Sequence, residues 1–365
     1  MRVYNRDKRS SYFNWRDDVK LIVDTDIGDD IDDAFAIRFL DECEEIEWIG
    51  ITTVYKNTSQ RAKIAKKLTG RKIPVYAGEN KPLQRDVRLL LGEKIGENGL
   101  IDIDHFSDAA KNEICDGDDA VDFILSQLKK YPNEITILAI GSLTNLAKAI
   151  LRDREVFCLV NRLVIMGGRF KEEIPEWNIE TDPEAARIVF KSEVNTVLVP
   201  YDVTILCDMS KDEVDAVRQA VGEKNAYLAS MMDRWIEHYD PNWDGKEKLP
   251  VLHDLLVAES LADETVCTYT DIKFDLHDDG CTVKSTNGDY SVKVAVSVDA
   301  VKFKQGLYAI IGKADGASTV SVEEETQNGD YYAVGALLNA HEGIVTEEKG
   351  NVRYGIFACD NQNRK

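Results

Sequence analysis

The chain has 365 residues, 44% of them hydrophobic, which is enough for one large domain or two of ordinary size. Its formal net charge of −21 leaves no basic face for nucleic acid or an anionic membrane, so we expect neither as a partner. The apolar runs are also far shorter than a membrane span.

Two features of the sequence predict a cytoplasmic location. The basic residues 1–9 are followed by polar residues rather than by an apolar segment, which argues against a signal peptide. The seven cysteines are odd in number and form no close pair in sequence, as is typical of a reduced intracellular chain.

Short runs rich in Ile and Val alternate with helical patterns through most of the chain. The expected strands are 19–24, 46–53, 73–77, 135–140, 162–166 and 196–201. The expected helices are 32–41, 58–69, 118–130, 144–152 and 182–191. Because the strands are apolar almost throughout, this alternation predicts a single α/β domain with a mainly parallel central sheet flanked by helices on both faces.

The later part of the chain follows a different pattern. Residues 210–262 are mostly helical, and we expect them to cover the functional site. Residues 290–298 alternate with period two, as a late strand should. The Gly- and Glu-rich tail at 313–365 has room for a hairpin over 343–358.

The most informative segment is acidic. Six carboxylates fall within the ten residues 24–33, directly after the apolar run 21–23. So many like charges at one strand end destabilise a fold unless a cation lies among them, and Ca²⁺ and Mg²⁺ take carboxylate oxygens as ligands. The segment therefore predicts a metal site first and a phosphate-binding loop second.

Other polar or flexible residues also fall where strands end. Asp26 follows the first expected strand, Asn57 the second, Gly141 the fourth, and Gly167 with Gly168 the fifth. Ligands of open parallel sheets bind outside the carboxyl ends of the strands, so these loops predict one shared site.

These motifs resemble a known family. The run Asp24-Thr25-Asp26-Ile27-Gly28-Asp29-Asp30-Ile31-Asp32-Asp33-Ala34 is similar to the signature of the inosine-uridine-preferring nucleoside hydrolases, in a variant two residues longer than its commonest form. Further segments match in order, at 52–57, at 141–147, at 166–168 with 176–179 and 182–186, and at His253-Asp254.

The resemblance implies an activity and a domain organisation. The fold would be nucleoside hydrolase-like with a Rossmann-like core, forming a catalytic domain over 1–312, with motifs from about residue 20 and a C-terminal extension over 313–365. The activity would be Ca²⁺-dependent hydrolysis of the N-glycosidic bond of a ribonucleoside, giving ribose and a free base. The family also favours a homo-oligomer, either a dimer or a tetramer.

The resemblance also implies site residues. Asp26 would be both a metal ligand and the general base for the attacking water, and His253 would face the leaving base and could protonate it. The other metal ligands would be Asp33, Asp254 and the backbone carbonyl of Ile140, and the ribose hydroxyls would be held by Asp32, Asn57, Glu176 and Asn178. Trp177 is the first candidate for an aromatic wall beside the base, followed by Tyr239 and Trp243.

Two departures from the family pattern concern substrate recognition. Residues Ile95-Gly96 stand where many members have a His-Gly before the Glu-x-Gly-Leu loop. The short stretch 169–175 lacks the Asn that many members have after Met-Gly-Gly. The preferred nucleoside therefore stays open.

Two other functions remain alternatives. A metal-dependent phosphoryl-transfer enzyme would need a cation aimed at phosphate, for which Lys56 and Arg169 are the candidates. A protein that binds a nucleoside or sugar without cleaving it would need neither Asp26 nor His253 as a catalytic group. Asp29 and Asp30 also fit a solvated loop that caps the following helix.

Overall fold

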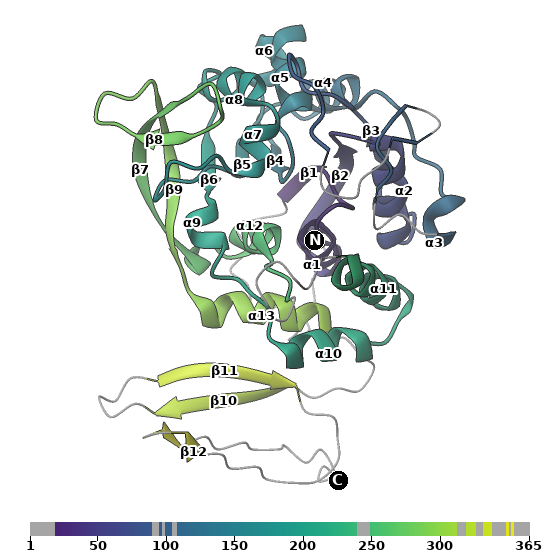
Figure 1. Ribbon diagram of the computed structural model, residues 1–365, viewed down its shortest axis with the longest axis vertical. Coiled ribbons are helices and arrows are strands. Elements are labelled where there is room, and N and C mark those ends of the chain that lie inside the picture. Colours follow the sequence, from purple (N-terminus) through teal and green to yellow (C-terminus); the bar gives the residue numbers. More distant parts are fainter. Residues whose placement is uncertain are drawn as a thin grey trace, which may run out of the picture.

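One mixed sheet forms the centre of the protein (Figure 1). The computed structural model describes residues 19–89, 95–96, 99–103, 108–238 and 249–311, and the backbone of 319–325, 331–337, 348–349 and 352–353. The sheet has the strand order β3-β2-β1-β4-β5-β6-β9-β7-β8. Its strands are β1 Val19–Thr25, β2 Ile46–Thr53, β3 Val75–Ala77, β4 Ile135–Ala139, β5 Arg162–Met166, β6 Thr196–Val199, β7 Cys267–Leu276, β8 Thr282–Lys284 and β9 Tyr290–Val298. In this order all neighbours from β3 to β9 pair in parallel, whereas β7 pairs antiparallel with both β9 and β8. The prediction of a mainly parallel α/β sheet is therefore confirmed.

Helices cover both faces of this sheet. They are α1 Asp32–Glu42, α2 Thr58–Leu68, α3 Asp108–Lys111, α4 Ala120–Lys130, α5 Thr144–Arg152, α6 Arg154–Phe157, α7 Trp177–Thr181, α8 Pro183–Phe190, α9 Tyr201–Thr204, α10 Lys211–Gln219, α11 Glu223–His238, α12 His253–Ala262 and α13 Ala300–Ile311. Successive side chains of a strand point to opposite faces, so Leu21 and Val23 of β1 pack with α1, α2, α11, α12 and α13. Ile22, between them, packs with α4, α5 and α8 on the other face.

Two local differences from the predicted elements have physical causes. The strand expected over 196–201 ends at Val199, because Pro200 leads into α9 at Tyr201. Strands β7 and β8 were not expected, although Ile272, Phe274 and Leu276 alternate with polar residues as a strand with one buried face should.

The C-terminal strands form two small sheets of their own. β10 Thr319–Glu325 pairs antiparallel with β11 Tyr331–Leu337, outside the nine-stranded sheet in Figure 1. β12 Glu348–Lys349 pairs antiparallel with β13 Val352–Arg353, which confirms the hairpin expected over 343–358. The domain boundary at 312 stays a prediction.

The order of the strands fixes where a site can form. The chain runs from β1 through β2 to β3 on one side and then crosses to β4 on the other side of β1. At such a topological switch point the loops after the two central strands diverge and leave a crevice for ligands. Asp26 directly follows β1, and Ile140 directly follows β4.

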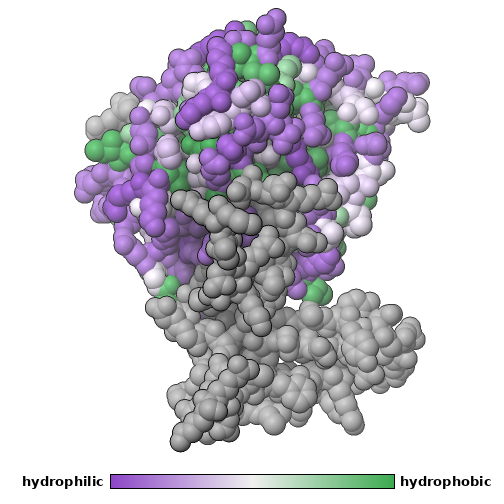
Figure 2. Space-filling model, turned by 180° about the vertical axis from the view of Figure 1, so that it is seen from behind, coloured by the Kyte–Doolittle hydropathy of each residue, from purple (hydrophilic) through white to green (hydrophobic). Residues whose placement is uncertain are grey.

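The outer surface agrees with the composition. In the view of Figure 2 the coloured surface is mainly hydrophilic, with apolar residues scattered among polar ones. Among the described helices, none combines the length and the apolar character needed to cross a membrane.

Candidate active site

The turns that follow β1 and β4 are in direct contact. A Cβ atom on Gly141 would lie 2.8 Å from the backbone nitrogen of Asp26 and 2.9 Å from its Oδ1 atom, which is closer than real Cβ contacts. The backbone nitrogen of Ile140 donates to the carbonyl of Asp24 at 2.8 Å. Only a glycine at position 141 therefore lets the turn after β4 lie this close to Asp26.

Three buried carboxylates meet beside these turns. Asp32 and Asp33 open α1, Asp254 lies in the first turn of α12, and one oxygen of each lies within 4.8 Å of the others. They are 4%, 3% and 3% exposed, respectively. Among the described residues, this group has the geometry of a metal site.

The predicted metal ligands divide into two sets. Asp33 and Asp254 lie together as expected, and Asp32, which the resemblance assigned to the ribose, lies with them. Asp26 and the carbonyl of Ile140 are outside this group of three, so their roles as ligands stay predictions.

The negative charges of these three carboxylates are not fully compensated by nearby positive charges. Burial and the negative charges of neighbouring carboxylates hold the pKa of Asp32, Asp33 and Asp254 well above the usual range. The charge of Asp26 acts on each of them in the same direction. The amino-terminal ends of α1 and α12 supply partial positive charge here, and a bound cation would supply far more.

Asp26 itself lies under two opposing influences. Burial raises the pKa of this carboxyl to about 6, while the Arg61 and Lys56 cations lower it. A carboxylate with a pKa in this range can accept a proton near neutral pH.

Asp24 supports the site from below. Its Oδ1 atom accepts hydrogen bonds from the Thr52 hydroxyl at 2.6 Å and from the Asn145 side chain at 2.7 Å. Burial raises its pKa to about 7. Asp24 therefore connects β1 to β2 and α5.

Asn57 leaves one polar atom unused. It caps α2, and its Oδ1 atom accepts from the backbone nitrogen of Gln60 at 3.3 Å. Its Nδ2 atom is buried and has no hydrogen-bond partner. A buried donor left without a partner costs about 1–3 kcal/mol, so a ligand acceptor would relieve it.

Glu176 and Asn178 lie at the carboxyl end of β5. The Glu176 carboxylate caps α7 and accepts from the backbone nitrogens of Asn178 at 2.9 Å, Gly168 at 3.1 Å and Ile179 at 3.2 Å. Burial raises its pKa to about 7. The side chain of Asn178 donates to the carbonyl of Met166 at 3.3 Å. Both side chains are therefore fixed at the same edge of the sheet as Asp26.

Trp177 joins the loops after β2 and β5. Its ring meets Tyr55 edge to face, with centroids 6.4 Å apart. The Lys56 ammonium lies 5.8 Å and the Arg88 guanidinium 5.5 Å from its centroid. The role of Trp177 as an aromatic wall beside the base stays a prediction, and Tyr239 and Trp243 lie outside the described residues.

His253 is held by two residues that sequence analysis did not identify. Its Nδ1 atom shares a hydrogen bond of 2.8 Å with the Thr204 hydroxyl, and its ring stacks on Tyr201 with centroids 5.5 Å apart. Burial lowers the pKa of the imidazole to about 4, so the ring is neutral at neutral pH. Both partners lie on α9, which is too short to give a periodic signal.

The two cations that a phosphoryl-transfer enzyme would need are already compensated. The Lys56 ammonium pairs with Asp29 at 2.7 Å. Arg169 pairs with Glu172 and stacks on Tyr201, with its guanidinium carbon 4.6 Å from the ring centroid. Neither arrangement favours a phosphate subsite.

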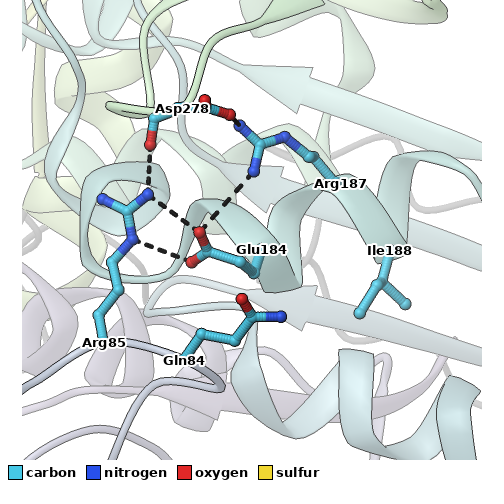
Figure 3. Close-up of a pocket in the computed structure, with 6 residues that line it drawn as sticks. All are labelled: Gln84, Arg85, Glu184, Arg187, Ile188 and Asp278. Atoms are coloured by element: carbon cyan, nitrogen blue, oxygen red, sulfur yellow. Dashed lines mark hydrogen bonds and ion pairs between the residues drawn. The ribbon is translucent and has the colours of Figure 1, made fainter.

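A separate surface hollow of about 580 Å³ contains none of the predicted site residues (Figure 3). Arg85 pairs with Glu184 at 2.9 Å, and Arg187 pairs with Asp278 at 2.7 Å. Because these charges satisfy one another, we assign no ligand to the hollow and regard it as a junction between the segment around Gln84, helix α8 and the turn before β8.

Comparison with known proteins agrees with this geometry. The model of the family "Inosine-uridine preferring nucleoside hydrolase" matches residues 21–305. Uridine nucleosidase 1 of Arabidopsis thaliana is 33% identical over 261 residues, covering 68% of this chain and 76% of the relative. The inosine-uridine preferring nucleoside hydrolase of Leishmania major is 31% identical over 304 residues, covering 78% and 94%. The structure of a purine-preferring ribonucleoside hydrolase from Gardnerella vaginalis is 27% identical with a TM-score of 0.67, covering 80% of this chain and 98% of that one.

The fold and the site define an α/β enzyme with an acidic centre at the switch point of a parallel sheet. The chain belongs to the inosine-uridine preferring nucleoside hydrolase family. It is a hydrolase of N-glycosyl compounds that cleaves ribonucleosides, as the sequence analysis predicted.

The raised pKa values predict how pH affects the metal-free protein. Asp24, Asp26 and Glu176 have folded-state pKa values of about 7, 6 and 7, above their ordinary values. Each therefore contributes stability that is present at low pH and is lost as pH rises through the folded value. His253 has the opposite effect on stability. Because its pKa is lowered to about 4, the protein loses stability as pH falls below the ordinary pKa of histidine, but this one group is outweighed by the three carboxyls.

We expect the melting temperature of the chelator-treated protein to fall between about pH 5 and about pH 8. An excess of divalent cation should reduce the fall, because a cation binds the ionised carboxylates. Calorimetry at several pH values measures both effects. A melting temperature that rises steadily over this interval without metal would contradict the assignment of these carboxyls.

Proposed function

We propose that this ribonucleoside hydrolase binds Ca²⁺ through Asp26, Asp33, Asp254 and the carbonyl of Ile140, and that Asp26 is its general base. The observation that carries the proposal is that buried carboxylate oxygens of Asp32, Asp33 and Asp254 lie within 4.8 Å of one another. They lie beside the turns at the topological switch point of the sheet. Asp32 is close enough to serve the metal as well as the ribose.

The donor set fits a hard cation. Every group at the centre offers oxygen, and the carboxylates lie on different elements, α1 and α12. Ca²⁺ accepts six to eight oxygens in flexible geometry, whereas Mg²⁺ requires a near-ideal octahedron. When bound, the ion would orient a water molecule and lower its pKa.

The chain's own residues would carry out the remaining steps. The Asp26 carboxylate would accept a proton from the attacking water as the water approaches the anomeric carbon. The free Nδ2 donor of Asn57 would bind a ribose hydroxyl, and Glu176 and Asn178 would orient the sugar from the end of β5. These contacts would hold the ribose as it develops the oxocarbenium character of the transition state.

His253 would serve the leaving base as a neutral donor. The Thr204 hydroxyl lies 2.8 Å from Nδ1 but 3.5 Å from the carbonyl of Tyr201. The shorter contact favours donation from Thr204 to Nδ1, which puts the ring proton on Nε2. Nε2 would then donate to the departing base.

The proposal leaves the nucleobase of the substrate and the number of subunits open. Relatives are named for uridine, for inosine with uridine and for purines, so we propose a small ribonucleoside as the substrate without choosing its base. By family resemblance we also propose a cytoplasmic homo-oligomer, either a dimer or a tetramer.

Removal of the metal should abolish turnover. We expect chelator treatment to stop the release of reducing sugar from a panel of nucleosides, and Ca²⁺ to restore it better than Mg²⁺. Asp33→Asn should abolish calcium binding in calorimetry, because it removes a central ligand. The loop variant Asp30→Asn is the control. Tight nucleoside binding without sugar release, by the calcium-loaded protein, would instead favour a non-catalytic binding protein.

Asp26→Asn should lower kcat by about 10²- to 10⁴-fold, because the amide cannot accept the proton. The side chain keeps its size, so circular dichroism should show an unchanged fold. Reducing-sugar release under saturating nucleoside measures the loss. Normal turnover in this variant would remove Asp26 as the base.

His253→Ala should slow the cleavage of a natural nucleoside by about 10²-fold, because the departing base would lose the hydrogen bond that stabilises its developing negative charge. An activated aryl riboside, whose leaving group needs no proton, should be affected much less. Comparing kcat for the two substrates tests the role of the ring. Equal losses would show that His253 does not assist departure.

A further inference from the structure

A fully buried arginine lies beneath the acidic loop. Arg61 of α2 is 0% exposed. Its guanidinium donates to the carbonyls of Asp26 and Ile27, the latter at 3.0 Å, and its Nε atom donates to the carbonyl of Tyr55 at 2.7 Å. A further nitrogen donates to Asp29 Oδ2 at 2.8 Å. One side chain thus holds the backbone after β1 and the backbone after β2 in a single arrangement.

Asp29 receives a second cation on the same oxygen. The Lys56 ammonium lies 2.7 Å from Asp29 Oδ2, and this lysine is 1% exposed. Burial opposes ionisation of Asp29, but Arg61 and Lys56 hold its pKa below the usual range. Asp29 is therefore an ionised member of a buried cluster, and the interpretation of a solvated loop residue does not apply to it.

The backbone around Lys56 also needs support. Tyr55 and Lys56 have φ angles of 67° and 59°, in the left-handed region that side chains rarely adopt. Such a backbone conformation costs free energy and persists only where its surroundings fix it. The bonds from Arg61 to Tyr55 and from Lys56 to Asp29 supply part of this fixation.

We propose that Arg61 is a positioning residue, which together with Asp29 and Lys56 fixes the loop that carries Asp26 and so sets the affinity of the carboxylate cluster for its cation. The inference rests on the proposed function, because it concerns the metal of that site. Arg61 touches neither metal nor substrate in this proposal and acts through the backbone of residues 26–29.

The geometry explains why another cation would not serve. A guanidinium carries five donors in a planar fork, and Arg61 uses them on acceptors from two loops. A lysine has a single ammonium that cannot reach all of these acceptors. Removing one member of a buried ion pair also leaves an uncompensated charge.

The test compares calcium affinity with stability. Arg61→Met, Arg61→Lys and Asp29→Asn are treated with chelator, checked for folding by circular dichroism, and titrated with Ca²⁺ in a calorimeter. We expect each to weaken the calcium Kd by about 10- to 100-fold, as removal of a residue that orients metal ligands does. Arg38→Met is the matched control, since Arg38 of α1 is 4% exposed and pairs with Asp41 at 3.2 Å.

The control separates positioning from folding. Arg38→Met should lower the melting temperature and leave the calcium Kd unchanged. If Arg61→Met gives that same pattern, Arg61 is only structural and the inference is wrong. If Arg61→Met does not fold, Asp29→Asn decides by the same criterion, because it keeps the size of the side chain.

The inference and the proposed function fail in different ways. If Asp33→Asn abolishes calcium binding and the Arg61 and Asp29 variants bind normally, only the positioning role is lost. If Asp33→Asn binds Ca²⁺ normally, the metal site itself is wrong.

Discussion

Repulsion among buried carboxylates is the constraint on which the site depends. Burial raises the cost of ionising Asp26, Asp32, Asp33 and Asp254, and the charge of Asp26 raises it further at the other three. Two features of the fold reduce this cost. The amino-terminal ends of α1 and α12 lie on one side of the carboxylates, and buried cations such as Arg61 lie on the other. The negative charge that these groups do not compensate lies at the centre of the carboxylate cluster. A cation bound there would stabilise the fold and would also take part in catalysis.

Sheet topology brings these charges together. The crossing of the chain from β3 to β4 opens the sheet beside β1, and the loops after β1, β2, β4 and β5 meet at that edge. The glycine at 141 allows the turn after β4 to approach Asp26, and α12 adds its acidic first turn from the other side. A site of this kind needs residues from distant parts of the chain, so it exists only where the sheet and its helices are assembled.

The sequence allowed much of this to be predicted, for physical reasons. The central strands are buried on both faces, so their apolar runs stand out, and the acidic loop has no structural purpose without a counter-charge. Arg61 could not be predicted, because a basic residue in an amphipathic helix resembles a surface cation. The contact between Thr204 and His253 was equally hidden, since it joins elements 49 positions apart. By contrast, the alternation of Ile272, Phe274 and Leu276 with polar residues is visible in the sequence, although β7 was not predicted.

The ion pairs of the charged junction in Figure 3 are more exposed to solvent than the pairs beneath the acidic loop. Arg85 fastens its segment to Glu184, and in the same segment the backbone of Arg88 donates to the Tyr55 hydroxyl at 2.9 Å, beside the Trp177 ring. Dissolved salt weakens the interactions of exposed charges, with a Debye length of about 8–10 Å at physiological ionic strength, but screens buried pairs much less. The segment around Arg85 is therefore open to the ionic composition of its surroundings, whereas the pairs beneath the acidic loop are insulated from it.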